Sequence, residues 1–251
     1  MPNSIDDPWL HIERAKEHLQ DLDAKISEFV EANPFRVTAY EDVHNATYIM
    51  RLRIPIIDLK LAVIAGESIY NLRVALDHIA WQLALTNKDR PHDRTAFPVV
   101  DENTVDKMRR FDRITRDIPG AAVDVIRTLQ PYHRGSDFTE SPLWKLDKLC
   151  NIGKHRVIPA QGTALEFKIP KNVDTSLISL NALKDEYIVT MPLSVKTQMQ
   201  RAPLPAADIV FGSRVDGITI NAEGLAKLYD FVRDEVYPTF TGFFHSDRGS
   251  T

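Results

Sequence analysis

Cysteine is almost absent from this chain of 251 residues, which has only Cys150. One cysteine excludes an internal disulfide and any zinc site built from several cysteines, and it suits a reducing compartment. The chain also lacks a run of about 18 apolar residues, and its first residues show no charged segment followed by an apolar one. We therefore expect a cytoplasmic protein with no contact to a membrane.

An excess of positive charge is absent as well. The formal net charge is −4 and the isoelectric point is about 6.1, so nucleic-acid binding would have to rest on a local basic patch. The chain contains neither a His-Glu-x-x-His pair nor a Gly-x-Ser-x-Gly elbow, and "CNIGKH" lacks the residues of a phosphate-binding loop. With 43% hydrophobic and 26% charged residues, it has the composition of an ordinary globular protein with a sizeable core.

Hydrophobic periodicity predicts an α+β fold in a single domain, 1–251. A helical portion, about 1–158, contains an N-terminal β-hairpin at "FRVTAYEDVHNATYIMRLRIP". A β-rich portion, about 159–220, has short strands separated by turn residues and forms an antiparallel meander, which a helix at 221–245 closes. Further helices are expected from about Pro8 to Asn33, from Asp58 to Leu85, after Pro119, and after Ser141, with a long charged loop and a short helix at 88–116.

The first helix should bury a stripe of apolar residues spaced three to five apart. Its members are Leu10, Ala15, Leu19, Leu22, Ile26 and Val30.

Polar residues in the helix at 58–85 are sorted by face. Six apolar residues share a core side about 100° wide: Ile69, Leu72, Leu76, Ile79, Ala80 and Leu83. A second stripe holds Glu67, Asn71, His78 and Gln82, and a third holds Tyr70, Arg73, Asp77 and Trp81. Arg73 and Asp77 are spaced to form an ordinary ion pair, but their large apolar neighbours are unusual for a free surface. This sorting of polar residues onto separate faces of the helix indicates a candidate functional site.

A second polar helix, "SPLWKLDKLCNIGKHR", has the same division. Leu146, Leu149 and Ile152 form its apolar side, and the opposite side carries Asp147, Asn151, Lys154 and His155, followed by Arg156. Basic residues at a helix C-terminus are favoured by the helix dipole alone. Alternatively, they bind a phosphate or carboxylate while His155 exchanges protons near neutral pH. Cys150 is interpreted as a small buried thiol rather than a nucleophile activated by His155.

A metal site is disfavoured by distance along the helix. Glu67 and His78 share a stripe, but eleven residues separate their backbones by about 16 Å. We expect neither a metal nor another cofactor.

The pair of motifs "NLRVALDH" and "NIGKHR" resembles a family of uncharacterised bacterial proteins with N-L-R-x-A-L-D-H and N-x-x-K-H-R. A broader resemblance links Arg73 and His78 to the HEPN superfamily of helical RNA-targeting proteins, in which an Arg and a His cleave RNA without metal at a dimer interface. It implies that His78 is the acid and base and that Arg73 stabilises phosphate charge. On a regular helix these side chains point about 140° apart, so they would cooperate across a bend or a subunit interface.

Two hypotheses follow from the polar helices 67–82 and 147–156, which we expect to face each other around a shared pocket. In the first, the protein cleaves or transfers phosphodiesters of RNA or nucleotides, with a homodimer as a candidate assembly. The catalytic residues are then His78, Arg73 and His155. The substrate-binding residues are Asn71, Asp77, Asp147, Asn151, Lys154 and Arg156. In the second, the protein is a non-enzymatic module. Asp77 and Asp147 then form salt bridges with Arg73 and with Lys154 or Arg156, or the polar groups hold a small anion.

Overall fold

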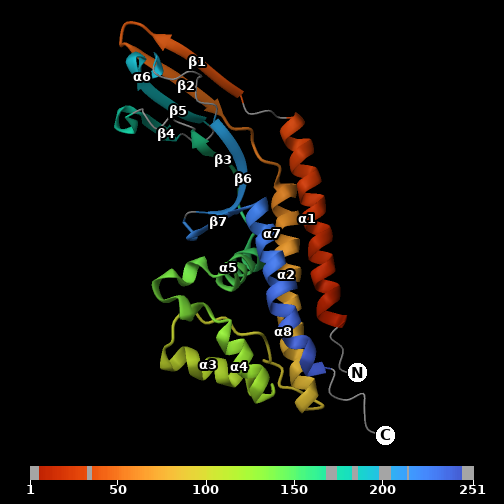
Figure 1. The fold of residues 1–251 in the computed structure, drawn as a ribbon. Coiled ribbons are helices and arrows are strands. Elements are labelled where there is room, and N and C mark those ends of the chain that lie inside the picture. The colour runs from red at the N-terminus through yellow and green to blue at the C-terminus, as the bar shows by residue number, and fades with distance from the viewer. Residues whose placement is uncertain are drawn as a thin grey trace. The chain divides into compact units, whose positions relative to one another are not determined.

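A computed structural model describes residues 6–32, 36–167, 174–182, 186–197, 205–213 and 215–244. The order of elements confirms the α+β class. The helical portion comprises α1 (Asp6–Ala32), the strands β1 (Arg36–Asp42) and β2 (Thr47–Arg53), then α2 (Leu59–Asn87), α3 (Val105–Thr115), α4 (Gly120–Thr128), the 3-10 segment η1 (Pro131–Glu140) and α5 (Pro142–His155). Figure 1 shows these elements along the chain.

The rest of the chain is rich in short strands, as predicted. It comprises β3 (Ala160–Phe167), η2 (Thr175–Leu177), β4 (Ser179–Ala182), β5 (Glu186–Pro192), α6 (Leu193–Thr197), β6 (Pro205–Ser213) and β7 (Ile218–Asn221). The closing helix is α7 (Ala222–Asp230), a π-helical stretch η3 (Phe231–Val236), α8 (Tyr237–Thr241) and η4 (Gly242–Phe244). Asn221 caps α7 by accepting a hydrogen bond from the Gly224 backbone. The ends of the predicted first and last helices, Asn33 and residue 245, and the end of "TALEFKIP" lie outside the described residues.

The strands form two antiparallel sheets with the orders β1-β2-β5-β4 and β3-β6-β7. The predicted hairpin is confirmed: Val37 is opposite Leu52 and Ala39 is opposite Met50, so these side chains share one face. The hairpin does not stand alone, because β5 pairs along the whole of β2. The β-rich portion thus extends the N-terminal hairpin as well as pairing with itself.

Contacts divide the chain into two compact units, and α1, α2 and β6 each pass from one to the other. We call Met1–Asp23, Ala62–Pro159 and Gly212–Thr251 the helical unit, and Ala24–Leu61 and Ala160–Phe211 the sheet unit. The single-domain organisation stays a prediction.

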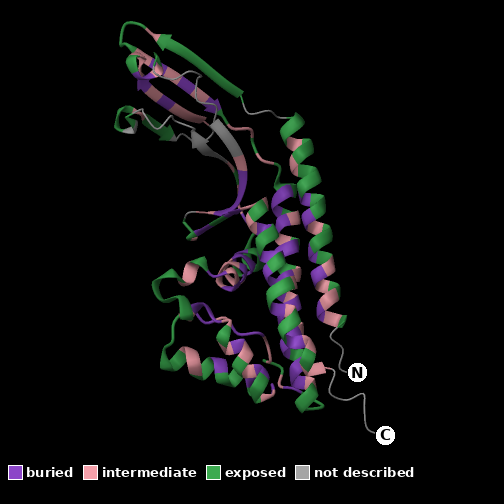
Figure 2. Cartoon of the chain, in the orientation of Figure 1, coloured by how far each residue is buried: buried purple, intermediate pink, exposed green. Residues whose placement is uncertain are grey.

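The sheet unit has its own apolar cluster on one face of the four-stranded sheet. Tyr48 and Met50 of β2 lie opposite Met191 and Val189 of β5, and Val195 of α6 packs with them. Figure 2 shows buried residues alternating along both strands, as expected for a sheet with one covered face. All but the last residue of the edge strand β1 are exposed.

The helical unit is centred on α2, whose six predicted core residues are all 1% exposed or less. In α1, Ala15, Leu19 and Leu22 are buried as predicted, but Leu10 is 66% exposed and Ile12 is fully buried in its place. The error at Leu10 has a simple cause: several stripes drawn at three- to five-residue spacing fit α1, and only the contact with α2 selects one. Val30 also lies at the exposed end of the predicted stripe.

Candidate functional site

Arg73 connects α2 to α5 and to the segment around Phe97. Its side chain is 11% exposed. The guanidinium donates from Nε to Asp147 (3.2 Å), from one terminal nitrogen to Asp77 (2.7 Å), and from the other to the carbonyl of Phe97 (2.8 Å). Asp77 also accepts from the Phe97 backbone, and Asp147 accepts from Asn151. Arg73 is therefore engaged on three sides by partners that fix where these segments meet.

The other polar stripe of α2 faces α1. Asn71 Oδ1 lies 3.1 Å from a ring nitrogen of His11, and Glu67 lies 3.4 Å from His18. Gln82 donates to Asp7. His78 stacks edge-on against His11, with 4.6 Å between the ring centres, and its Nδ1 lies 3.2 Å from an Asp7 oxygen at an angle outside hydrogen-bond geometry. The residues of this stripe belong to the α1–α2 contact.

The predicted site residues are thus distributed rather than gathered. Helices α2 and α5 do meet, through Arg73 and Asp147. His78 lies in the α1–α2 contact, whereas His155 is exposed at the end of α5 and lines none of the three pockets described below. Arg156 pairs with Asp216, so Asp147 takes Arg73 as its cation instead of Arg156.

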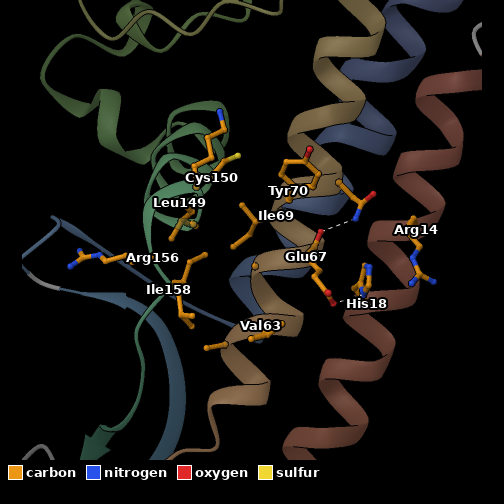
Figure 3. Close-up of a pocket in the computed structure, with 16 residues that line it drawn as sticks. Arg14, His18, Val63, Glu67, Ile69, Tyr70, Leu149, Cys150, Arg156 and Ile158 are labelled. Atoms are coloured by element: carbon orange, nitrogen blue, oxygen red, sulfur yellow. Dashed lines mark hydrogen bonds and ion pairs between the residues drawn. The ribbon is translucent and has the colours of Figure 1, made fainter.

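One pocket with a large apolar lining lies across α2, between α1 and α5. We call it the α1–α2–α5 pocket; its volume is about 560 Å³. Figure 3 shows Ile69, Leu149 and Ile158 converging between α2 and α5, where they form an apolar floor. Tyr70 and Val63 extend the apolar lining and are 55% and 47% exposed. This size and lining are typical of ligand pockets.

The glycines of the two facing helices keep this floor open. A β-carbon at Gly153 of α5 would lie 3.6 Å from the Ile158 side chain, and one at Gly66 of α2 would lie 3.9 Å from it. Larger side chains at either position would occupy the space beside Ile158. Gly153 lies within the continuous helix α5, so it makes this room without ending the helix.

The charges around the α1–α2–α5 pocket are mostly positive. Figure 3 shows Arg14 and Arg156 at opposite ends of the pocket and Glu67 reaching toward His18. Arg14 pairs with the exposed Glu17, and Arg156 pairs with Asp216. Lys154 has no carboxylate partner among the described residues, and Glu67 is the only carboxylate in the lining. Lys154 is therefore a lining cation whose charge no carboxylate of the described residues compensates.

Cys150 also lines this pocket, but it is 3% exposed. Burial raises the pKa of its thiol, and this effect exceeds the opposing influence of Lys154 and Arg73. A thiol that stays protonated is a poor nucleophile, as the interpretation of a small buried residue expects.

A smaller pocket of about 300 Å³ lies where Arg73, Asp147 and α3 come together, and we call it the Arg73 pocket. Lys154 lines this pocket as well, together with Lys107 and Arg110. Lys107 bonds to Asp101 and Glu102. The carboxylates around Arg73 and Lys107 neutralise much of the positive charge here, so Lys154 and Arg110 are the more available cations.

No group of three or more His, Cys, Asp or Glu side chains with metal-binding geometry occurs within the ranges that the structure describes. In the same ranges, none of the helices combines the length and apolar character that a membrane span requires.

Sequence reasoning missed the contribution of α1. Asp7, His11 and His18 supply the partners of the second stripe, but their helix looks like an ordinary amphipathic one. A usable signal was present, because His11 and His18 are seven residues apart and share a face with the buried Ala15. Polar residues on the buried side of a helix predict that the helix packed against this side also carries polar residues.

Comparison of the chain with protein-family models, curated proteins and solved structures finds no match in any of the three. The function must therefore be argued from the site.

Proposed function

We propose that this protein is a binding module that holds a small amphipathic anion in the α1–α2–α5 pocket. The observation that carries the proposal is the position of Lys154, an ammonium without a carboxylate partner among the described residues, at the edge of an apolar cavity of about 560 Å³. Burying an apolar group against Ile69 and Leu149 would supply affinity. The charge of Lys154 would select a carboxylate or phosphate over a neutral group.

The Arg73 network supports a structural role for the polar residues that the sequence singles out. Arg73 has three partners at 2.7–3.2 Å, and two of these are carboxylates. To stabilise a phosphate during RNA cleavage it would have to leave Asp77 and Asp147, which would then lose their shared cation. Partners of this kind favour the binding module, in which Arg73 fixes the position of α5 and thereby of Lys154.

Calorimetric titration with 3-phenylpropionate tests the proposal, with 3-phenylpropan-1-ol as the uncharged control ligand. We expect the acid to bind about fivefold more tightly than the alcohol, because a partly exposed ion pair contributes up to about 1 kcal/mol. Lys154→Met keeps the apolar stem of the side chain and should remove this preference. Lys148→Met is the matched control, since Lys148 is on the same helix and lines none of the three pockets.

A second variant separates the apolar contribution from the charge. Tyr70→Ala shortens a wall residue that is 55% exposed, so the fold should tolerate the change. It should weaken the acid and the alcohol equally. If the acid binds no better than the alcohol, or if Lys154→Met binds it as the wild type does, the proposed anion site is wrong.

RNA-directed cleavage remains the enzymatic hypothesis and has its own test. Purified protein is incubated with RNA and with nucleotides, and the wild type is compared with His78→Ala and His155→Ala. The hypothesis expects cleavage that both variants reduce, whereas equal products from all three proteins would end it. Sedimentation of the wild-type protein would detect the homodimer that this mechanism needs.

A further inference from the structure

A third pocket lies near the other end of α2 and has the opposite electrostatic character. We call it the Trp81 pocket; it has a volume of about 590 Å³. Seven residues line it: Asp7, Asp77, His78, Trp81, Gln82, Leu85 and Thr95. None of them is Lys or Arg, and two are carboxylates. A cavity that lacks fixed cations and carries two carboxylates disfavours an anion and favours a cation.

Several oxygen atoms of the lining residues can accept a further hydrogen bond. Asp7 uses the same oxygen toward Gln82 and toward His78, so within the described residues its other oxygen accepts no hydrogen bond. Asp77 similarly uses one oxygen for both Arg73 and the Phe97 backbone. The hydroxyl of Thr95 is buried and has no hydrogen-bond partner in the described part of the chain. A buried polar atom without a partner is costly, and a ligand that donates hydrogen bonds would satisfy it.

Trp81 completes the pocket with an aromatic surface. Its side chain is among the exposed large hydrophobic groups, at 36% exposure, while Leu85 beside it is half-buried. An ammonium group is attracted to the face of an indole ring, and the carbon skeleton of an amine can cover apolar residues such as Leu85. An inorganic divalent ion would use neither the ring nor the apolar wall.

We propose that the Trp81 pocket binds a small organic amine, with Asp7 as the counter-ion and Trp81 as the surface on which the organic part lies. The ammonium donates to Asp7 and to the Thr95 hydroxyl. Asp77 contributes less to this attraction, because Arg73 already neutralises much of its charge. This proposal is independent of the anion site, which shares no lining residue with the Trp81 pocket.

The test uses 2-phenylethylamine and its uncharged counterpart 2-phenylethanol as probes, titrated into the full-length protein by calorimetry and by two-dimensional NMR. We expect the amine to bind at least about fivefold more tightly than the alcohol. The indole N–H signal that disappears in Trp81→Phe should shift on titration with the amine. Lys154→Met should leave amine binding unchanged, and Asp7→Asn should leave 3-phenylpropionate binding unchanged.

Two variants probe the site without dismantling it. Asp7→Asn retains the shape of the side chain and should weaken the amine about fivefold, and Thr95→Val removes the hydroxyl and should weaken it about twofold. Unchanged melting temperatures would show that both variants fold. Glu17→Gln serves as the charge-matched control, because Glu17 lies on α1 but outside the three pockets.

Three outcomes would overturn the proposal. The first is equal affinity for the amine and the alcohol. The second is undiminished amine binding by Asp7→Asn together with Trp81→Ala. The third is sedimentation of the wild type as a dimer that Trp81→Ala dissociates, with no amine binding by either form, because Trp81 would then lie in a contact between two copies of the chain.

Discussion

Replacing Arg73 with methionine should destabilise the protein, because the change removes the charge that Asp77 and Asp147 share. The methionine fills most of the space of the aliphatic stem, so the loss is mainly of hydrogen bonds and charge. Arg73 is 11% exposed at its side chain, but Asp77 and Asp147 are 37% and 29% exposed. Water can therefore solvate the two carboxylates in part after the arginine is lost.

The magnitude follows from this partial exposure. Breaking a fully buried ion pair costs about 3–5 kcal/mol, and a hydrogen bond to a charged group contributes about 1.5–3 kcal/mol. With the carboxylates partly solvated, we expect Arg73→Met to lower the free energy of unfolding by about 2–3 kcal/mol. For a chain of this size such a loss corresponds to a melting temperature lower by about 5–10 °C.

Urea denaturation followed by circular dichroism measures the change, with thermal melting as a second readout. Arg113→Met is the matched control, because Arg113 is exposed on α3 and should lose less than about 0.5 kcal/mol. In a double-mutant cycle, Arg73→Met and Asp147→Asn should show coupling of about 1 kcal/mol. If Arg73→Met matches the control, Arg73 does not hold α2 and α5 together, and its assignment as a structural residue fails.

Three further perturbations test individual features of the helical unit. Cys150 should react with a thiol reagent far more slowly in the native protein than in urea, because burial excludes the reagent and raises the thiol pKa; equal rates would contradict its burial. The Lys88 ammonium lowers the pKa of Asp117, so this carboxylate stabilises the fold above the ordinary aspartate pKa and ceases to do so as the pH falls through its lower native value. Asp117→Asn should therefore be less stable than the wild type at neutral pH, and urea denaturation should show the difference shrinking below about pH 4; a constant difference would refute this origin. Gly212→Ala should cost at least about 2 kcal/mol of unfolding free energy, because Gly212 has a φ of +96° and its β-carbon would lie 2.4 Å from the Ile218 carbonyl oxygen. Gly217→Ala has a similar φ but open space, so its smaller loss in the same denaturation assay is the control, and equal losses would exclude the clash as the cause.

The two proposed pockets carry charges of opposite sign beside different parts of α2. The anion site uses Lys154 beside the Tyr70 part of the helix, and the amine site uses Asp7 beside Trp81. Because the two sets of ligands carry opposite charge, each variant has a specific expected defect. A general loss of folding would instead reduce both kinds of binding together.

The sequence by itself determined most of the helices and strands of this protein, and the buried side of α2. The apolar face of α2 and the paired faces of the β1–β2 hairpin follow from repeats of 3.6 and two residues, which any short stretch of chain reveals. The closing helix was also visible in the sequence, at 221–245.

The tertiary structure alone decided what each polar stripe contacts. Asn71 and His78 face His11 and Asp7 of α1 rather than Asn151 and His155 of α5, and Arg73 meets Asp147 seventy-four residues later in the chain. Periodicity gives the direction of a side chain around its own helix axis, but it carries no information on which other helix occupies that direction. That choice depends on packing of the whole core, which placed Lys154 at one pocket and Asp7 at another.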